Sequence, residues 1–276
     1  MMQSYFKRQI ALPQDHGSWV FILSPLLVGI FAGGIFQLPT LYLTIAAMSA
    51  FLIRQPITIV VKAMSGRRST ADLPAARFWL LVYGIIAAAA LTGLILSGYS
   101  YILYLAVPGA PVFAWHLWLV SKRAERKQVS VEVIATGVLA LTAPAAFWVG
   151  IGGYDPNGWW LWLFTWLQSA ASIVYAYLRL SQREMSQEQA AATSRAIWWK
   201  MGSRALLYTS FNVLLAAGLG ISALVPLFIF VPFLVQWLET IWGITHPAVG
   251  WKPVRIGVRQ LIVSILWTVL FVALWR

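Results

Sequence analysis

The amino-acid sequence predicts an all-α integral membrane protein, a bundle of nine transmembrane helices that forms a single domain over residues 1–276. Hydrophobic residues make up 60% of the chain and charged residues only 10%, a composition typical of a chain that lies mostly in lipid. Apolar runs of about 20 residues, long enough to cross a hydrocarbon core, recur along the sequence. The Lys and Arg residues gather in alternate connecting segments, as they do in polytopic membrane proteins.

Apolar run length locates the nine spans. They cover residues 18–37, 40–62, 78–97, 100–120, 130–150, 159–178, 205–222, 224–243 and 257–275. Tight linkers join the first and second, the third and fourth, and the seventh and eighth spans, so we expect each of these pairs to form an antiparallel hairpin. The first residues lack the order of charged, apolar and small residues that marks a signal peptide, so we expect the first span to be retained.

The distribution of charge predicts the orientation of the bundle. All of the 20 Lys and Arg residues except Arg276 fall on one face of the predicted topology. Cytoplasmic segments carry an excess of Lys and Arg, so we expect the N-terminus in the cytoplasm and the C-terminus outside, in a bacterial cytoplasmic or thylakoid membrane. The net charge of +12 follows from this topology, so we expect contact with anionic membrane lipids and no binding of nucleic acid.

Polar side chains form stripes in the cytoplasmic halves of several predicted spans. An ionisable group at the centre of a span costs about 2.5–3.5 kcal/mol, so such groups normally face the interior of the bundle. In the second span Arg54, Thr58 and Lys62 recur every four residues and therefore share one helical face. The sixth span continues such a face through Gln168, Ser172, Tyr175, Arg179 and Arg183, and the eighth carries Gln236, Glu239, Gly243 and His246.

Converging stripes would line a cytoplasm-facing basic cavity, and Arg suits phosphate because its planar guanidinium donates two parallel hydrogen bonds. The predicted phosphate-binding residues are Arg54, Lys62, Arg67, Arg68, Arg179, Arg183 and Arg204. An alternative applies to Lys62, Arg183 and Arg204, whose long side chains could extend to the membrane interface instead. For Arg67 and Arg68, the alternative is a solvated charge in the cytoplasmic loop.

Candidate acids and bases are Glu132, Glu239, His116 and His16. Glu239 could instead be a structural counter-ion of Arg54. Asp15 could orient the His16 imidazole, or it could cap the first helix. The chain has no Cys and only 3 His, which excludes thiolate chemistry and leaves few ligands for a metal, so we expect no metal and no cofactor.

Three segments resemble the YwiC-like family of bacterial membrane proteins. They read LPQDHGSWVFILSPLLVGIFAGG from Leu12, RAERKQVSVEVIATGVLALTAPAAF from Arg123 and SAASIVYAYLRL from Ser169. The resemblance implies a bacterial membrane protein and brings no known activity with it.

A second resemblance is architectural. Nine spans with the N-terminus inside and the longest cytoplasmic loops after the second and sixth spans are similar to the UbiA superfamily of intramembrane prenyltransferases. Those enzymes hold a prenyl diphosphate through magnesium bound by two Asp-rich motifs at these spans. Here the corresponding stretches, 54–62 and 175–183, are basic, and Asp72 and Glu184 are the nearby acids. The resemblance therefore implies no magnesium site, although basic residues could neutralise a diphosphate directly.

The sequence thus predicts a membrane protein that binds an anionic isoprenoid or lipid phosphate in a basic cavity between its second and sixth spans, in the manner of a transferase. Two alternatives stay open. One is a transporter or flippase of an anionic metabolite, favoured by the same basic cavity and by Pro residues that interrupt the spans. The other is a non-catalytic subunit or assembly factor of a larger membrane complex.

Overall fold

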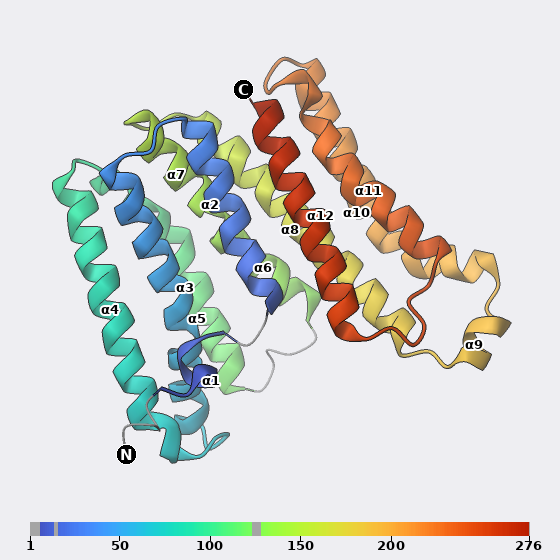
Figure 1. Cartoon of the computed structure of the whole chain (residues 1–276), viewed down its shortest axis with the longest axis horizontal. Helices are drawn as coiled ribbons and strands as arrows, with labels where there is room; N and C mark the ends of the chain where they lie inside the picture. Colours follow the sequence, from blue (N-terminus) through green and yellow to red (C-terminus); the bar gives the residue numbers. More distant parts are fainter. Residues whose placement is uncertain (1–5, 14–15, 123–127, 276) are drawn as a thin grey trace. The chain divides into compact units, whose positions relative to one another are not determined.

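The computed structural model describes residues 6–13, 16–122 and 128–275, and within these ranges it contains helices and no strands, which confirms the all-α fold class (Figure 1). Four short 3₁₀ segments accompany the α-helices. The α-helices are α1 (Arg8–Ala11), α2 (Val20–Gly33), α3 (Leu38–Met64), α4 (Leu73–Leu96), α5 (Ala106–Ser121), α6 (Val129–Ala140), α7 (Thr142–Ile151), α8 (Asn157–Arg183), α9 (Gln187–Ala192), α10 (Arg195–Ile221), α11 (Val231–Thr245) and α12 (Pro253–Trp275).

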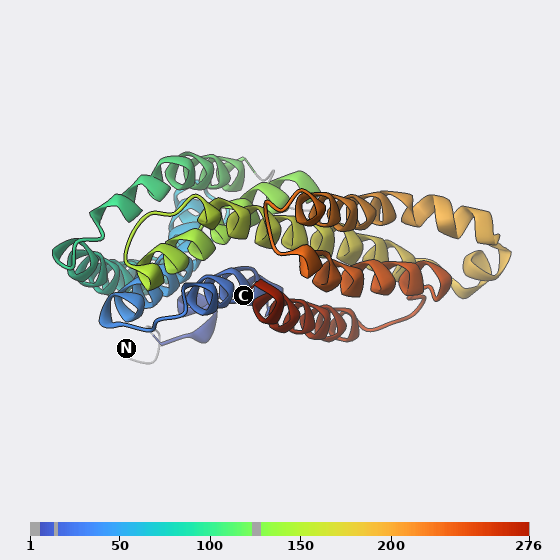
Figure 2. The same cartoon turned by 90° about the horizontal axis from the view of Figure 1, so that it is seen from above.

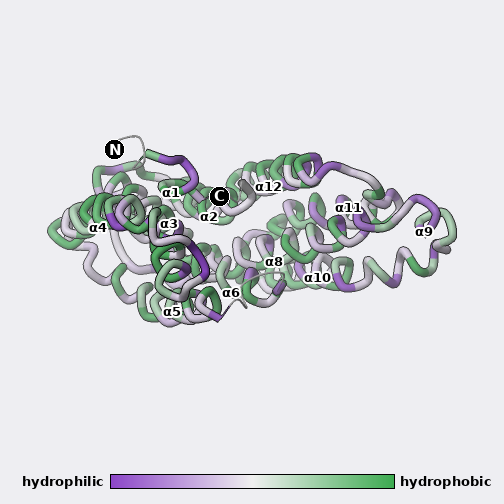
Figure 3. The backbone as a smooth tube through the Cα atoms, turned by 90° about the horizontal axis from the view of Figure 1, so that it is seen from below, coloured by the Kyte–Doolittle hydropathy of each residue, from purple (hydrophilic) through white to green (hydrophobic). Residues whose placement is uncertain are grey.

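The described residues contain 8 helical segments that are long and apolar enough to cross a membrane. These are Leu38–Met64, Thr70–Leu96, Ser100–Ser121, Val129–Ile151, Asn157–Arg183, Arg195–Ile221, Leu227–Thr245 and Pro253–Trp275. Each overlaps one of the predicted spans, and the remaining predicted span corresponds to a shorter apolar helix, Gly17–Gly33. Figure 3 shows hydrophobic residues along most of the helix lengths and hydrophilic residues around their connections, for example near α9.

Local sequence explains where two predicted spans differ from the helices. The first span was predicted to reach residue 37, but α2 ends at Gly33 because Gly34 adopts a left-handed conformation with φ +75°, which glycine allows. The fifth span is broken at Leu141 into α6 and α7. Pro144 lies in the first turn of α7, where it has no N–H to donate to the carbonyl four residues earlier.

The chain divides into two compact units, residues 1–158 and 159–276. In the N-terminal unit α3 packs along α4, and α2 packs along α7. In the C-terminal unit α11 packs against both α10 and α12, and Figure 2 shows α10 and α11 running side by side. The helices α10, α11 and α12 thus lie together in this unit.

Glycines allow the close approach of α2 to α7. Gly29 and Gly33 recur four residues apart on α2 and are both buried, a pattern that lets two membrane helices approach closely. A Cβ at Gly29 would overlap the Ala143 carbonyl oxygen and lie 2.8 Å from the Ala146 Cβ. A Cβ at Gly33 would lie 3.0 Å from the Gly150 Cα. The contact between these helices therefore depends on residues without side chains.

Gly29→Ala is expected to lower the free energy of unfolding by about 1–3 kcal/mol, because an added methyl group in a close-packed interface forces backbone shifts. The control is Gly84→Ala in α4, where a Cβ meets nothing within 4 Å; alanine there should be neutral or slightly stabilising. Thermal unfolding of the detergent-solubilised variants measures both effects. Equal melting temperatures for the two variants would show that the α2–α7 contact is not tight.

Candidate functional site

The polar stripes of α8 and α11 face each other in the C-terminal unit. They consist of Gln168, Ser172, Tyr175 and Arg179 on α8 and of Gln236, Glu239 and Gly243 on α11. The Tyr175 hydroxyl donates a hydrogen bond of 2.7 Å to Glu239 Oε1. One turn further along, Arg179 Nη1 donates to the Gly243 carbonyl at 2.6 Å. The stripes predicted from the sixth and eighth spans therefore meet along a shared buried seam.

Arg179 lies at the cytoplasmic end of this seam under the predicted orientation, with only 1% of its surface exposed. Its Nη1 donates to the Gln182 Oε1 at 2.8 Å and to the His246 carbonyl at 2.8 Å, in addition to the Gly243 carbonyl. Gly243 and His246 lie at the C-terminal end of α11, where helix carbonyls lack intrahelical partners. A cation bonded to these carbonyls also complements the helix dipole. Arg179 thus caps α11.

Aromatic rings surround the same guanidinium. The Arg179 Cζ lies 5.4 Å from the Trp242 ring centroid and 4.8 Å from the Trp251 ring centroid, within the range of a cation–π interaction. Gln182, fully buried, also binds the segment after α11, because its Oε1 accepts from the Ala248 N–H at 3.2 Å. Together these contacts fix the connection between α11 and α12.

Glu239 pairs with Arg259 of α12, a cation that the sequence prediction did not consider as its partner. Arg259 Nε donates to Glu239 Oε1 at 2.6 Å and Arg259 Nη2 donates to Oε2 at 2.8 Å, the bidentate geometry that suits an Arg–carboxylate pair. Glu239 is 8% exposed and also accepts from Tyr175. Sequence spacing could place Glu239 on a buried face, but it could not identify which helix supplied the cation.

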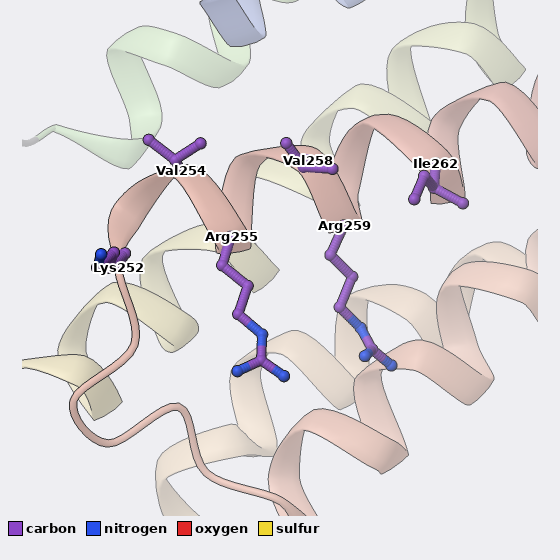
Figure 4. A pocket seen from close by; sticks show the side chains of 6 residues that line it. All are labelled: Lys252, Val254, Arg255, Val258, Arg259 and Ile262. Atoms are coloured by element: carbon purple, nitrogen blue, oxygen red, sulfur yellow. The ribbon is translucent and has the colours of Figure 1, made fainter.

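A basic hollow of about 500 Å³ lies on α12 next to this pair. Its lining residues are Lys252, Val254, Arg255, Val258, Arg259 and Ile262. Figure 4 shows the Arg255 and Arg259 side chains extending from α12 in the same direction. Their guanidinium carbons lie 3.9 Å and 3.5 Å from the ring centroids of Trp251 and Trp242, respectively. We refer to this hollow, together with the cations Lys252, Arg255 and Arg259 that line it, as the basic hollow.

The cations of the basic hollow differ in how their charge is balanced. Arg259 is paired with Glu239, as described above. Lys252 and Arg255 are exposed, and neither has a carboxylate partner among the residues that the structure describes. An anion that entered the hollow would therefore meet two cations whose charge no carboxylate of the described chain compensates.

In the N-terminal unit, Arg54 of α3 and His116 of α5 line one small cavity of about 60 Å³. Its other lining residues are the apolar Val112, Phe113, Ala135, Val138 and Leu139. Arg54 belongs to the N-terminal unit and Arg179 to the C-terminal unit. The cavity shared by the second and sixth spans therefore stays a prediction.

Two further predicted phosphate ligands bind protein groups in the N-terminal unit. Arg67 Nη1 donates to the Val120 carbonyl at the end of α5. Arg68 donates from Nε and Nη2 to Asp72 Oδ2 at 3.0 Å and 2.8 Å, and Lys7 Nζ lies 3.5 Å from the other carboxylate oxygen. Asp72 thus serves as a local counter-ion for the loop that follows α3.

The other predicted site residues occupy separate positions. Lys62 lies in the last turn of α3, and Glu132 is exposed in the first turn of α6. Arg183 Nε donates to the Trp251 carbonyl at 2.9 Å, and Arg204 is exposed on α10.

His16 begins a 3₁₀ segment, His16–Trp19. Asp15, expected either to orient the His16 imidazole or to cap the first helix, lies outside the described residues, as do Arg123 and Arg276.

The cations at the start of α12 were not among the predicted site residues. Lys252, Arg255 and Arg259 are spaced by three and four residues, a pattern that predicts one shared helical face. This spacing, directly after Trp251, is the signal that could have identified them. The pairing with Trp242 of α11 could not be read from any local pattern.

The helices and their hydrophobic surfaces define an integral membrane protein. The family model described as YwiC-like protein matches residues 12–147, almost the whole N-terminal unit. An uncharacterised protein YwiC of Bacillus subtilis (strain 168) is 25% identical over 219 residues, which cover 78% of this chain and 82% of that protein. The N-terminal half of the chain thus matches the YwiC-like family, as the sequence resemblance predicted. No solved structure matches it at a significant level, and the architectural resemblance to the UbiA superfamily stays a prediction.

Proposed function

We propose that this protein binds an anionic lipid phosphate, isoprenoid or glycerolipid, at the basic hollow of α12. The phosphate lies against Lys252 and Arg255, and the hydrocarbon chain follows the apolar side of the same helix. The observation that carries the proposal is that exposed cations without described carboxylate partners and exposed aliphatic side chains line one hollow at the start of α12. A lipid with a charged head and an apolar tail matches both features.

The apolar part of the hollow supports a lipid over a free anion. Val254, Val258 and Ile262 are 73%, 49% and 53% exposed and recur every four residues, so they form a continuous stripe along α12. Val269, further along the helix, is 61% exposed. In the lipid phase such a stripe contacts acyl or isoprenoid chains. The ligand's tail therefore has an apolar surface that begins at the cations.

Electrostatics at the start of α12 supports a phosphate head group. The helix begins at Pro253 and is 23 residues long, so this end carries the positive end of the helix dipole. Lys252 and Arg255 flank this end. Cations next to a membrane helix attract anionic lipid head groups by about 1 kcal/mol each.

The proposal covers binding and not turnover. Glu239, the predicted acid or base nearest to the hollow, is held by Arg259 and Tyr175. His116 and Glu132 belong to the N-terminal unit. A carboxylate that accepts three hydrogen bonds from cation and hydroxyl donors is a structural partner rather than a general base.

The double substitution Lys252→Ala with Arg255→Ala is expected to weaken the binding of farnesyl diphosphate by about 2 kcal/mol, roughly thirtyfold, because two head-group contacts are lost. Equilibrium binding to the purified protein in zwitterionic detergent measures the effect. Inorganic diphosphate, which lacks a tail, should compete much less well, and equal competition would show that the head group alone is bound.

The charge-matched control is Arg195→Ala with Lys200→Ala on α10 of the same unit, where both side chains are exposed. The control should retain nearly full affinity at an ionic strength of about 0.15 M, where distant surface charges are screened. Equal losses for the two double variants would reject the basic hollow as the site, because they would show only a dependence on net charge.

A further inference from the structure

Buried polar side chains form a ladder inside the C-terminal unit, which extends from the Glu239–Arg259 pair to the Trp267 indole. The ladder comprises Gln168 and Ser172 of α8, Gln236 of α11, and Gln260 and Trp267 of α12, each less than 10% exposed. Ser172 Oγ donates to Gln260 Oε1 at 2.9 Å, and Gln168 Nε2 donates to Gln236 Oε1 at 3.4 Å. Three helices therefore direct carboxamide, hydroxyl and indole groups into one shared interior.

Four polar atoms of this ladder are buried and have no hydrogen-bond partner among the residues that the structure describes: Gln168 Oε1, Gln236 Nε2, Gln260 Nε2 and Trp267 Nε1. Other buried polar groups on α8 are satisfied by their own helix, because Thr165 Oγ1 donates to the Leu161 carbonyl and Ser169 Oγ to the Thr165 carbonyl. Buried polar atoms without protein partners are uncommon and point to a bound water or ligand. Here four of them share one interior.

Both ends of the ladder are defined by side chains. On the side of the ladder away from Arg259, four buried aromatic rings form a closed layer: Phe164, Phe233, Trp267 and Phe271. Their centroids lie 4.7–5.9 Å apart in the contacting pairs. At the other end lies the Arg259 side chain, which is 36% exposed. Arg259 thus forms the more exposed end of the ladder, and the aromatic layer lies at the opposite end.

We propose that ordered water molecules occupy the interior between α8, α11 and α12, from the Glu239–Arg259 pair to the Trp267 indole. The three unpartnered N–H groups donate to water oxygen, and a water O–H donates to Gln168 Oε1. Water fits this set because it both donates and accepts. This hydrated interior is distinct from the basic hollow proposed for the anionic lipid.

The absence of Cys from the chain makes a single introduced thiol a specific reporter of this water. Ser172→Cys places a thiol in the ladder with little change in volume. Ala171→Cys is the control, because Ala171 is fully buried and lies one position away, on a different face of α8. After transfer to D₂O, the infrared S–H stretching band is expected to convert to S–D at least tenfold faster in Ser172→Cys than in Ala171→Cys.

Ser264→Cys on α12 provides a second reporter, since Ser264 is 5% exposed and lies between Gln260 and Trp267 on the same helical face. It should exchange at a rate similar to that of Ser172→Cys and keeps the test decisive if the latter does not fold. Equal exchange of the reporters and the Ala171→Cys control, whether fast or slow, would overturn the proposal. Binding of farnesyl diphosphate is measured separately, so a failure of either proposal is recognised by itself.

Discussion

Arg179→Ala is expected to lower the free energy of unfolding by about 3 kcal/mol or more, the largest effect that we predict for this protein. The substitution removes a charged donor from the carbonyls of Gly243 and His246 and from Gln182, and hydrogen bonds to charged groups contribute about 1.5–3 kcal/mol. It also leaves a cavity between Trp242 and Trp251 at a fully enclosed position. The loss of the buried guanidinium offsets part of this cost, because its desolvation is no longer required.

Two substitutions control this prediction. Arg179→Lys should recover little stability, because an ammonium lacks the planar fork that both stacks on rings and reaches several oxygens. Arg183→Ala, on the same face of α8, should cost less than about 1 kcal/mol, since it removes a single described hydrogen bond, to the Trp251 carbonyl, from a partly exposed side chain. Thermal unfolding in detergent ranks the three variants.

The same measurements separate the structural interpretation of Arg179 from the predicted role as a phosphate ligand. If Arg179 caps α11, stability falls in Arg179→Ala. If Arg179 binds phosphate instead, the melting temperature stays near that of the wild type while the affinity for farnesyl diphosphate decreases. An unchanged melting temperature would therefore contradict the cap.

Glu239→Gln is expected to have effects of opposite sign on stability and on binding. Stability should fall by about 2–3 kcal/mol, because a neutral amide cannot replace the bidentate pair with Arg259 and the carboxylate of the pair is buried. The affinity for an anionic lipid should rise by about 1 kcal/mol, roughly fivefold, because Arg259 lines the basic hollow and its charge is no longer compensated.

A double-mutant cycle with Arg259→Gln isolates the interaction between the two side chains. The coupling free energy is expected to be about 2 kcal/mol, within the range found for contacting partners in one network. A coupling near zero would show that the pair does not stabilise the unit. A weaker affinity for farnesyl diphosphate in Glu239→Gln would contradict the assignment of Arg259 to the ligand site.

Local patterns in the sequence predicted the helices well. Apolar run length placed a helix at each predicted span, since the need for about 20 apolar residues is set by the bilayer and not by the neighbours of a segment. The spacing of Gln168, Ser172, Tyr175 and Arg179 likewise predicted one polar face on α8, because helical periodicity fixes which residues share a side. The meeting of this face with the polar face of α11 follows from both stripes being too polar for lipid.

The sequence by itself determined that this protein belongs in a membrane, where its helices lie, and which of their faces are polar. The tertiary structure alone decided the partners across helices: Arg259 for Glu239, the α11 carbonyls for Arg179, and α12 as the helix that carries the basic hollow. The physical reason is that periodicity is a property of one helix, whereas pairing depends on how helices far apart in the chain pack and rotate against each other. Such contacts leave no mark on the spacing of residues within either helix.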